Sequence, residues 1–100
     1  MRQVNIRLTS ETNQQLRWLA AKHWTATDAL RQGLLLGSTV STPELTPAPY
    51  IHRRTLWLTD RELMILRSSE VSQSEAIRQA IAVAFSFYQR VHSLKEVVAA

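Results

Sequence analysis

Polar and apolar residues alternate strictly near the start of the chain, from residue 3 to residue 8. A period of two is typical of a strand with one buried and one solvated face. The apolar members are expected to face a core: Val4, Ile6 and Leu8. The polar members project together from the other face: Gln3, Asn5 and Arg7. Taken alone, this pattern also fits an ordinary amphipathic edge strand.

Two helices are predicted after this strand. The first runs from about residue 9 to residue 22, and its apolar stripe has helical spacing: Leu16, Leu19, Ala20 and His23. The second begins at Thr25, which has capping-box spacing to Asp28. Its inner face comprises Ala29, Leu30, Gly33 and Leu34. Gly37 stands where a left-handed glycine commonly ends a helix.

The same unit recurs in the second half of the chain. Residues 27–34 align with residues 74–81, with three identities and five conservative changes. A strand is predicted at residues 51–58, followed by capping boxes that begin at Thr59 and Ser72. The last helix keeps an apolar stripe well beyond the point where the first copy stops: Ile77, Ile81, Ala84, Tyr88, Val91 and Val98.

Residues 38–50 contain three prolines and several hydroxyl side chains, a composition typical of a stiff, partly extended connector. Thirteen residues can span roughly 40 Å, which is enough to bring the second strand beside the first. The chain is therefore divided into a first unit at 1–37, a linker at 38–50 and a second unit at 51–100, within one compact domain.

A short strand followed by two helices resembles the ribbon-helix-helix family of DNA-binding proteins, to which Arc and MetJ belong. The resemblance rests on Ser-x-x-Glu followed by Ala-Ile-Arg-x-Ala-Ile at residues 72–81, and on the Gln-x-Asn-x-Arg ribbon at residues 3–7. It covers about residues 3–36 and 53–84. It implies a mainly α fold with a two-stranded antiparallel β-ribbon. Because both units lie on one chain, it also implies an intramolecular pseudo-dimer.

The resemblance implies that the ribbon enters the major groove of double-stranded DNA. The residues expected to contact bases are Gln3, Asn5, Arg7, Arg53, Thr55 and Trp57, with Asn5 near Thr55, Arg7 near Arg53 and Gln3 near Trp57. Arginine can bind guanine, and asparagine or glutamine can bind adenine. The starts of the second helices are expected to bind backbone phosphates: Thr25, Ala26, Thr27, Ser72, Gln73 and Ser74.

The second strand departs from this pattern in two places. Trp57 has one indole donor, so it cannot replace an arginine; it packs on a thymine methyl or a sugar, or contacts no base. Arg54 falls where Val4 is buried in the first strand. Either Arg54 lies at a frayed ribbon end, or the strand is shifted by one residue, which would put Arg54 and Leu56 in the groove. Both departures predict an asymmetric DNA footprint.

Composition and charge limit the classes of function that the chain can have. The net charge of +4 favours an acidic partner only weakly. The chain has no cysteine, and its histidines (His23, His52 and His92) lack metal-ligand spacing. We expect no enzyme, cofactor or small-molecule substrate, because no phosphate loop, nucleophile elbow or carboxylate pair is present. The sequence shows no membrane-length apolar run and no leader, so a cytoplasmic protein is expected.

Arg31 and Arg78 fit either phosphate contacts or ion pairs with neighbours such as Asp28 and Glu75.

Two functions follow from these patterns. The favoured one is sequence-specific DNA binding by a small transcriptional repressor or a plasmid or phage accessory factor. The alternative is an antitoxin-like interaction protein for which DNA binding is secondary. It would bind a second copy or another protein through its C-terminal helix, using Phe85, Tyr88, Val91, Leu94 and Val98.

Overall fold

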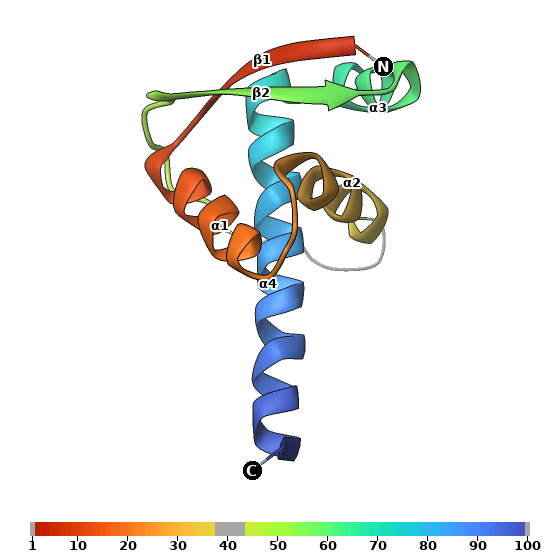
Figure 1. The fold of residues 1–100 in the computed structure, drawn as a ribbon. Coiled ribbons are helices and arrows are strands. Elements are labelled where there is room, and N and C mark those ends of the chain that lie inside the picture. Colours follow the sequence, from red (N-terminus) through yellow and green to blue (C-terminus); the bar gives the residue numbers. More distant parts are fainter. Residues whose placement is uncertain (1, 38–43, 100) are drawn as a thin grey trace.

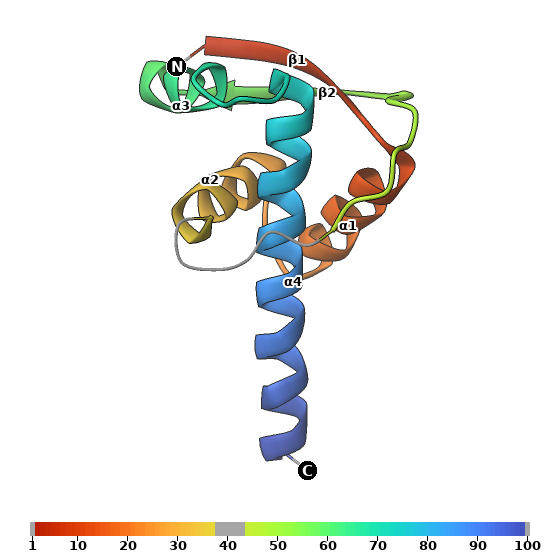
Figure 2. The same cartoon turned by 180° about the vertical axis from the view of Figure 1, so that it is seen from behind.

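The structure, a computed structural model, describes residues 2–37 and 44–99, and their side chains as far as Leu94. The elements in chain order are β1 (Arg2–Leu8), α1 (Ser10–Ala21), α2 (Ala26–Leu36), β2 (His52–Leu58), α3 (Asp60–Arg67) and α4 (Gln73–Ala99). The protein is mainly helical with a two-stranded antiparallel sheet, as the sequence predicts. The sheet lies at one end, and α4 runs from it between the other helices and out beyond them (Figures 1 and 2).

The strands β1 and β2 pair in the predicted register. Gln3 lies opposite Trp57, Asn5 opposite Thr55, and Arg7 opposite Arg53. The inner face carries the apolar members of the alternation, and four of them are at most 5% exposed: Ile6, Leu8, Leu56 and Leu58. Val4, which was also expected to face the core, is half-buried and packs against it. A one-residue shift of β2 is therefore excluded, because it would turn two buried leucines into solvent.

Arg54 of β2 lies differently from what was expected. It is not at a frayed end, because it pairs with Ile6 inside the ribbon and is half-buried on the inner face. His52 is the first residue of the strand. Its Nε2 atom is 3.2 Å from the Ser10 hydroxyl at the start of α1, which ties the ribbon end to that helix.

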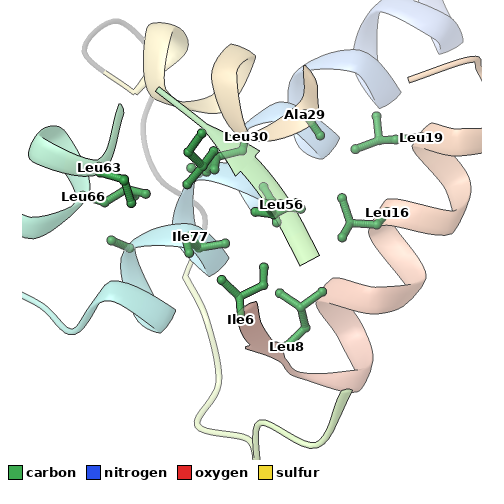
Figure 3. Close-up of a cluster of buried hydrophobic side chains, with 14 residues drawn as sticks. Ile6, Leu8, Leu16, Leu19, Ala29, Leu30, Leu56, Leu63, Leu66 and Ile77 are labelled. Carbon is green, nitrogen blue, oxygen red and sulfur yellow. The ribbon is translucent and has the colours of Figure 1, made fainter. Parts of the chain in front are cut away.

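The core lies between the ribbon and the four helices that the described residues form. Figure 3 shows Leu16 and Leu19 of α1 on one side of this cluster and Leu63 and Leu66 of α3 on the other. Helix α2 contacts β2, whereas α4 contacts β1, so each of these helices packs against the strand of the other half. The chain therefore buries its two halves against each other.

Helices α2 and α4 cross at Gly33 and Ala80. A methyl group on Gly33 would lie 1.8 Å from the Ala80 carbonyl oxygen and 2.9 Å from its Cα atom. Only glycine allows the two backbones to approach this closely. The two residues occupy equivalent positions in the repeat of 27–34 and 74–81, so the tightest contact joins matching points of the two halves.

The predicted stripe of α1 is partly wrong. The helix ends at Ala21 with Lys22 as its C-cap, close to the predicted end, and its buried positions are Thr12, Gln15, Leu16 and Leu19. Ala20 lies within the helix but is exposed, and His23 is exposed beyond the end of the helix. The N–H of His23 bonds to Ala20 and the N–H of Trp24 to Leu19, both at 3.0 Å. This is the Schellman pattern, and His23 has the left-handed φ of 69° that it requires.

Gly37 does not play the part expected of it. It is the C-cap of α2 with a right-handed φ of −60°, and its N–H bonds to Gly33. The residue that needs a left-handed backbone is therefore His23, in the turn before α2. By contrast, two predicted capping boxes hold, since Thr25 with Asp28 and Thr59 with Glu62 form them. At Ser72 half of the predicted box forms: its hydroxyl accepts from the Glu75 N–H, whereas the Glu75 carboxylate binds Tyr50 and Arg78.

Two arginines bind acidic side chains and so have structural roles. The Arg31 Nε atom lies 2.8 Å from a Glu62 carboxylate oxygen, which joins α2 to α3. Arg78 is 4% exposed and lies 3.7 Å from Glu75. It also donates to the carbonyl of Thr46 in the connector. Of the predicted linker, residues 38–43 lie outside the described part, and residues 44–50 are tied to α4 in this way.

Candidate nucleic-acid interface

The outer face of the ribbon carries six side chains, which we call the ribbon face: Gln3, Asn5, Arg7, Arg53, Thr55 and Trp57. All six are exposed. Alternation along each strand sends every second side chain outward, and the antiparallel register puts the three from β1 next to the three from β2. A hollow of about 630 Å³ lies over the middle of the ribbon, with Asn5, Arg7, Arg53 and Thr55 among its lining residues.

Asn5 and Thr55 interact at the centre of the ribbon face. The Thr55 hydroxyl donates to the Asn5 side-chain oxygen at 3.0 Å. This bond holds the amide in one orientation. Within the described part of the chain, its N–H groups have no hydrogen-bond partner, so they are available to an acceptor on a ligand. Asparagine held in this way can donate to one acceptor and accept from one donor, which is the pattern of an adenine edge.

The net charge of the protein resides on its ribbon. The whole chain has a net charge of +4. Strands β1 and β2 contain four arginines and no acidic residue (Arg2, Arg7, Arg53 and Arg54), so the remaining residues sum to zero. A modest total charge is thus concentrated on one element, where it can attract a polyanion.

Arg7 and Arg53 lie directly opposite each other. Like charges at facing positions of a ribbon are destabilising. Among the residues that the structure describes, neither side chain has a carboxylate within ion-pair distance. At the far end of the ribbon, by contrast, Arg2 lies 2.9 Å from Asp60. An anion placed between Arg7 and Arg53 would remove their repulsion.

Trp57 lies at the end of the ribbon face, opposite Gln3. Its side chain is 52% exposed, so a large apolar surface is presented beside polar groups. The ribbon face therefore has a cationic end, formed by Arg7 and Arg53, and an apolar end at Trp57. The two ends would not make equivalent contacts.

The expected phosphate contacts lie at the first turns of α2 and α4. Thr25 accepts from the N–H of Asp28 at 3.1 Å, and Ser72 accepts from the N–H of Glu75 at 3.2 Å. Both side chains are thus used as caps, and the Thr25 N–H is itself bonded to the Asp28 carboxylate at 3.3 Å. The other residues of this set, Ala26, Thr27, Gln73 and Ser74, are half-buried.

The structure divides the predicted partner surface on α4. The Phe85 ring lies 5.3 Å from that of Trp18, and the Tyr88 ring lies 4.5 Å from that of Trp24. Both rings are packed against the core because the two tryptophans fill the space beside α4. Val91 is half-buried, Leu94 is 65% exposed, and the side chain of Val98 lies outside the described part. Phe85 and Tyr88 therefore pack mostly within the chain and do not form the exposed partner surface that was expected of them.

Sequence reasoning missed one cationic residue of this region and misplaced another. Arg2, which extends the ribbon by one exposed position, was not considered, although counting charges strand by strand would have found it. Arg54 was considered but placed at a frayed end or in a shifted strand; it lies within the ribbon with its Nη1 atom buried and without a hydrogen-bond partner in the described structure. Neither joins the ribbon face, but both make the whole ribbon cationic.

No protein-family model, no curated protein and no solved structure matches this chain. The described helices include none long and apolar enough to cross a membrane. The described residues also contain no group of three or more His, Asp or Glu side chains that could hold a metal ion. The geometry of the ribbon is therefore the observation from which a function can be inferred.

Proposed function

We propose that this protein binds double-stranded DNA through its ribbon face, as a ribbon-helix-helix protein whose two halves form a pseudo-dimer within one chain. It would act as a small transcriptional repressor or a plasmid or phage accessory factor. The observation that carries the proposal is the antiparallel pairing of β1 with β2, which gathers six outward side chains on an element holding the entire net charge.

The size and chemistry of the ribbon suit the major groove. The groove is about 12 Å wide and admits a two-stranded ribbon, whose strands lie about 4.8 Å apart. Arg7 and Arg53 are exposed donors for guanine, and Asn5 and Gln3 can each bind an adenine edge. Each bidentate contact discriminates between bases by about 1–3 kcal/mol. Four such side chains are enough to specify a short site.

The two halves of the ribbon face offer different chemistry to DNA. Where β1 has Gln3, Asn5 and Arg7, the antiparallel partner positions carry Trp57, Thr55 and Arg53. Only the arginines match. The preferred site is therefore asymmetric, with polar readout in one half and an apolar contact, such as one with a thymine methyl, beside Trp57.

A partner-binding role for α4 has less support. Phe85 and Tyr88 are occupied by Trp18 and Trp24 within the chain itself. Of the proposed contact residues, Leu94 is the one whose described side chain is largely exposed. Truncation after Ala84, which would remove that surface, would also remove two rings from the core.

The test begins with selection of random-sequence duplexes on the full-length protein, followed by titration of the enriched duplex at several salt concentrations. Arg7→Ala and Asn5→Ala should each weaken binding about 5- to 150-fold and relax the preference at one position of the site. The logarithm of affinity should fall with the logarithm of salt by about 0.9 per phosphate contacted.

Arg17→Ala is the matched control, because Arg17 is an exposed arginine of α1 that lies off the ribbon. It removes the same charge and should leave site preference unchanged. Circular dichroism would establish that each variant is folded. Selection that enriches no sequence, or unchanged affinity in both ribbon variants, would show that the ribbon is not the DNA-binding element.

A further inference from the structure

A second hollow lies away from the ribbon, between the end of α1, the turn before α2 and the middle of α4. We call it the aromatic hollow. Its volume is about 400 Å³, and its lining includes Trp18, Lys22, His23, Trp24, Tyr88 and His92. Pockets that bind small molecules commonly measure about 300–1,000 Å³ and are mostly apolar and aromatic. The hollow is large enough for a ligand of one or two rings.

The walls of the hollow are held in place by ring contacts. Trp18 meets Phe85 and His92 edge to face, with ring centroids 5.3 Å and 6.0 Å apart. Trp24 and Tyr88 lie 4.5 Å apart at an angle of 40°. Such pairs add stability beyond the area they bury. Because neighbouring rings fix these side chains, a ligand would meet a formed site and would spend little free energy on ordering it.

The charge of the lining is cationic. The Lys22 ammonium lies 5.5 Å from the centroid of the Trp18 ring, and no acidic side chain lines the hollow. A cationic ligand would compete with Lys22 for that ring and be repelled by its charge. An anionic ligand would instead be attracted to the ammonium and could use the remaining aromatic surface of Trp24 and Tyr88.

The backbone at the hollow is strained. His23 has a φ of 69°, in a turn position where glycine is the usual residue. A non-glycine residue in this region costs free energy, and such residues cluster at ligand sites. The side chain that occupies the strained position lines the hollow, so the chain places an imidazole there at some cost in stability.

We propose that the aromatic hollow binds a planar aromatic anion of one or two rings, such as an aryl carboxylate. The ring lies against Trp24 and Tyr88, and the carboxylate pairs with Lys22. This inference does not depend on DNA binding, because the hollow and the ribbon face share no residue.

Indole-3-acetate and tryptamine are the probes, since they carry the same ring on side chains of opposite charge. In calorimetric titrations of the full-length protein, indole-3-acetate should bind at least about tenfold more tightly than tryptamine, because one close charge contact is worth about one power of ten. Backbone amide resonances should shift at residues 18–24 and 88–92. The resonances of the ribbon should stay in place.

Lys22→Gln should remove most of the discrimination between the two probes while the ring contacts remain. Arg17→Gln is the control, because it deletes a cation of the same helix that does not line the hollow. Val91→Phe tests the space itself, since Val91 lines the hollow and a larger side chain should block both probes. Equal affinity for the probes, no binding of either, or unchanged discrimination in Lys22→Gln would overturn the proposal.

Discussion

The sharpest test of the fold is the substitution Gly33→Ala at the crossing of α2 and α4. The added methyl group would lie 1.8 Å from the Ala80 carbonyl oxygen, 2.4 Å from its carbon and 2.9 Å from its Cα atom. All three are backbone atoms, so no change of side-chain rotamer can relieve the contact. Non-bonded atoms pack at roughly 3.5 Å, so the helices would have to separate by about 1.5 Å.

The cost follows from what this separation disturbs. Leu30 of α2 and Ile77 and Ile81 of α4 are fully buried around the crossing and would lose contacts as the helices part. Overpacking of this kind commonly costs about 1–3 kcal/mol, and more where backbone must move. Alanine regains about 1 kcal/mol in helix propensity over glycine. We expect a net loss of about 2 kcal/mol or more.

Urea denaturation followed by circular dichroism would measure this loss. Gly37→Ala is the matched control, because Gly37 is exposed and its nearest neighbour would be the Gly33 carbonyl oxygen at 3.2 Å. It should unfold at the wild-type urea concentration or slightly above. A Gly33→Ala protein as stable as the wild type would show that the two helices do not approach as closely as described here.

Three further predictions concern stability. His23→Gly should be neutral or stabilising, whereas His23→Val should cost about 1 kcal/mol or more, because a β-branched residue resists a φ of 69°. Burial acts to raise the pKa of Glu62, but hydrogen bonds from Arg31 and Thr59 outweigh it and hold the pKa below its usual value of 4.5. The contribution of this carboxylate to the free energy of unfolding is therefore present above pH 4.5 and is lost as the pH falls through the lower pKa of the folded state. Glu62→Gln should make the free energy of unfolding less dependent on pH in this acidic range and should cost about 1–3 kcal/mol at pH 7. Arg78→Ala should cost about 1–3 kcal/mol in urea denaturation, because Arg78 is 4% exposed and its loss removes its hydrogen bond to the Thr46 carbonyl and its ion pair with the half-buried Glu75.

The sequence predicted the ribbon well because the signals there are local. Strict alternation at residues 3–8 sets which face is buried, and Leu56 with Leu58 sets it for the second strand. Once both inner faces are known, a one-residue shift is too costly. A two-residue shift would keep the same faces, so the choice of register rested on the resemblance to the ribbon-helix-helix family. Helix starts were equally predictable, because a capping box such as that of Thr59 and Glu62 lies within four consecutive residues.

Helix ends were harder to predict. A Schellman turn is recognised in a sequence by its glycine, and here the left-handed residue is His23 whereas Gly37 is right-handed. The predicted stripe ran past the end of α1 to His23 for the same reason. The sequence pattern contains helical spacing, but it does not say where the hydrogen-bond ladder stops.

Side-chain contacts between distant segments, other than those across the ribbon, were not predicted. For Arg31 the sequence left open a phosphate contact or an ion pair with a neighbour such as Asp28, but the structure pairs it with Glu62, which lies 31 residues later. Phe85 and Tyr88 were interpreted as an exposed surface because Trp18 and Trp24, which cover them, belong to the first half of the chain. Such side-chain contacts depend on how the two halves of the chain pack against each other, and the periodicity within either half does not predict them.

The connector between α2 and β2 has a consequence for how the protein behaves on dilution. When each strand of a ribbon comes from a separate chain, the ribbon falls apart below the dissociation constant of the dimer. Here both strands are on one chain, and the connector sets their effective concentration, which for short tethers is in the millimolar range. A single molecule therefore carries both strands of its ribbon at any dilution. Under the proposed function, occupancy of a DNA site should rise with the first power of protein concentration.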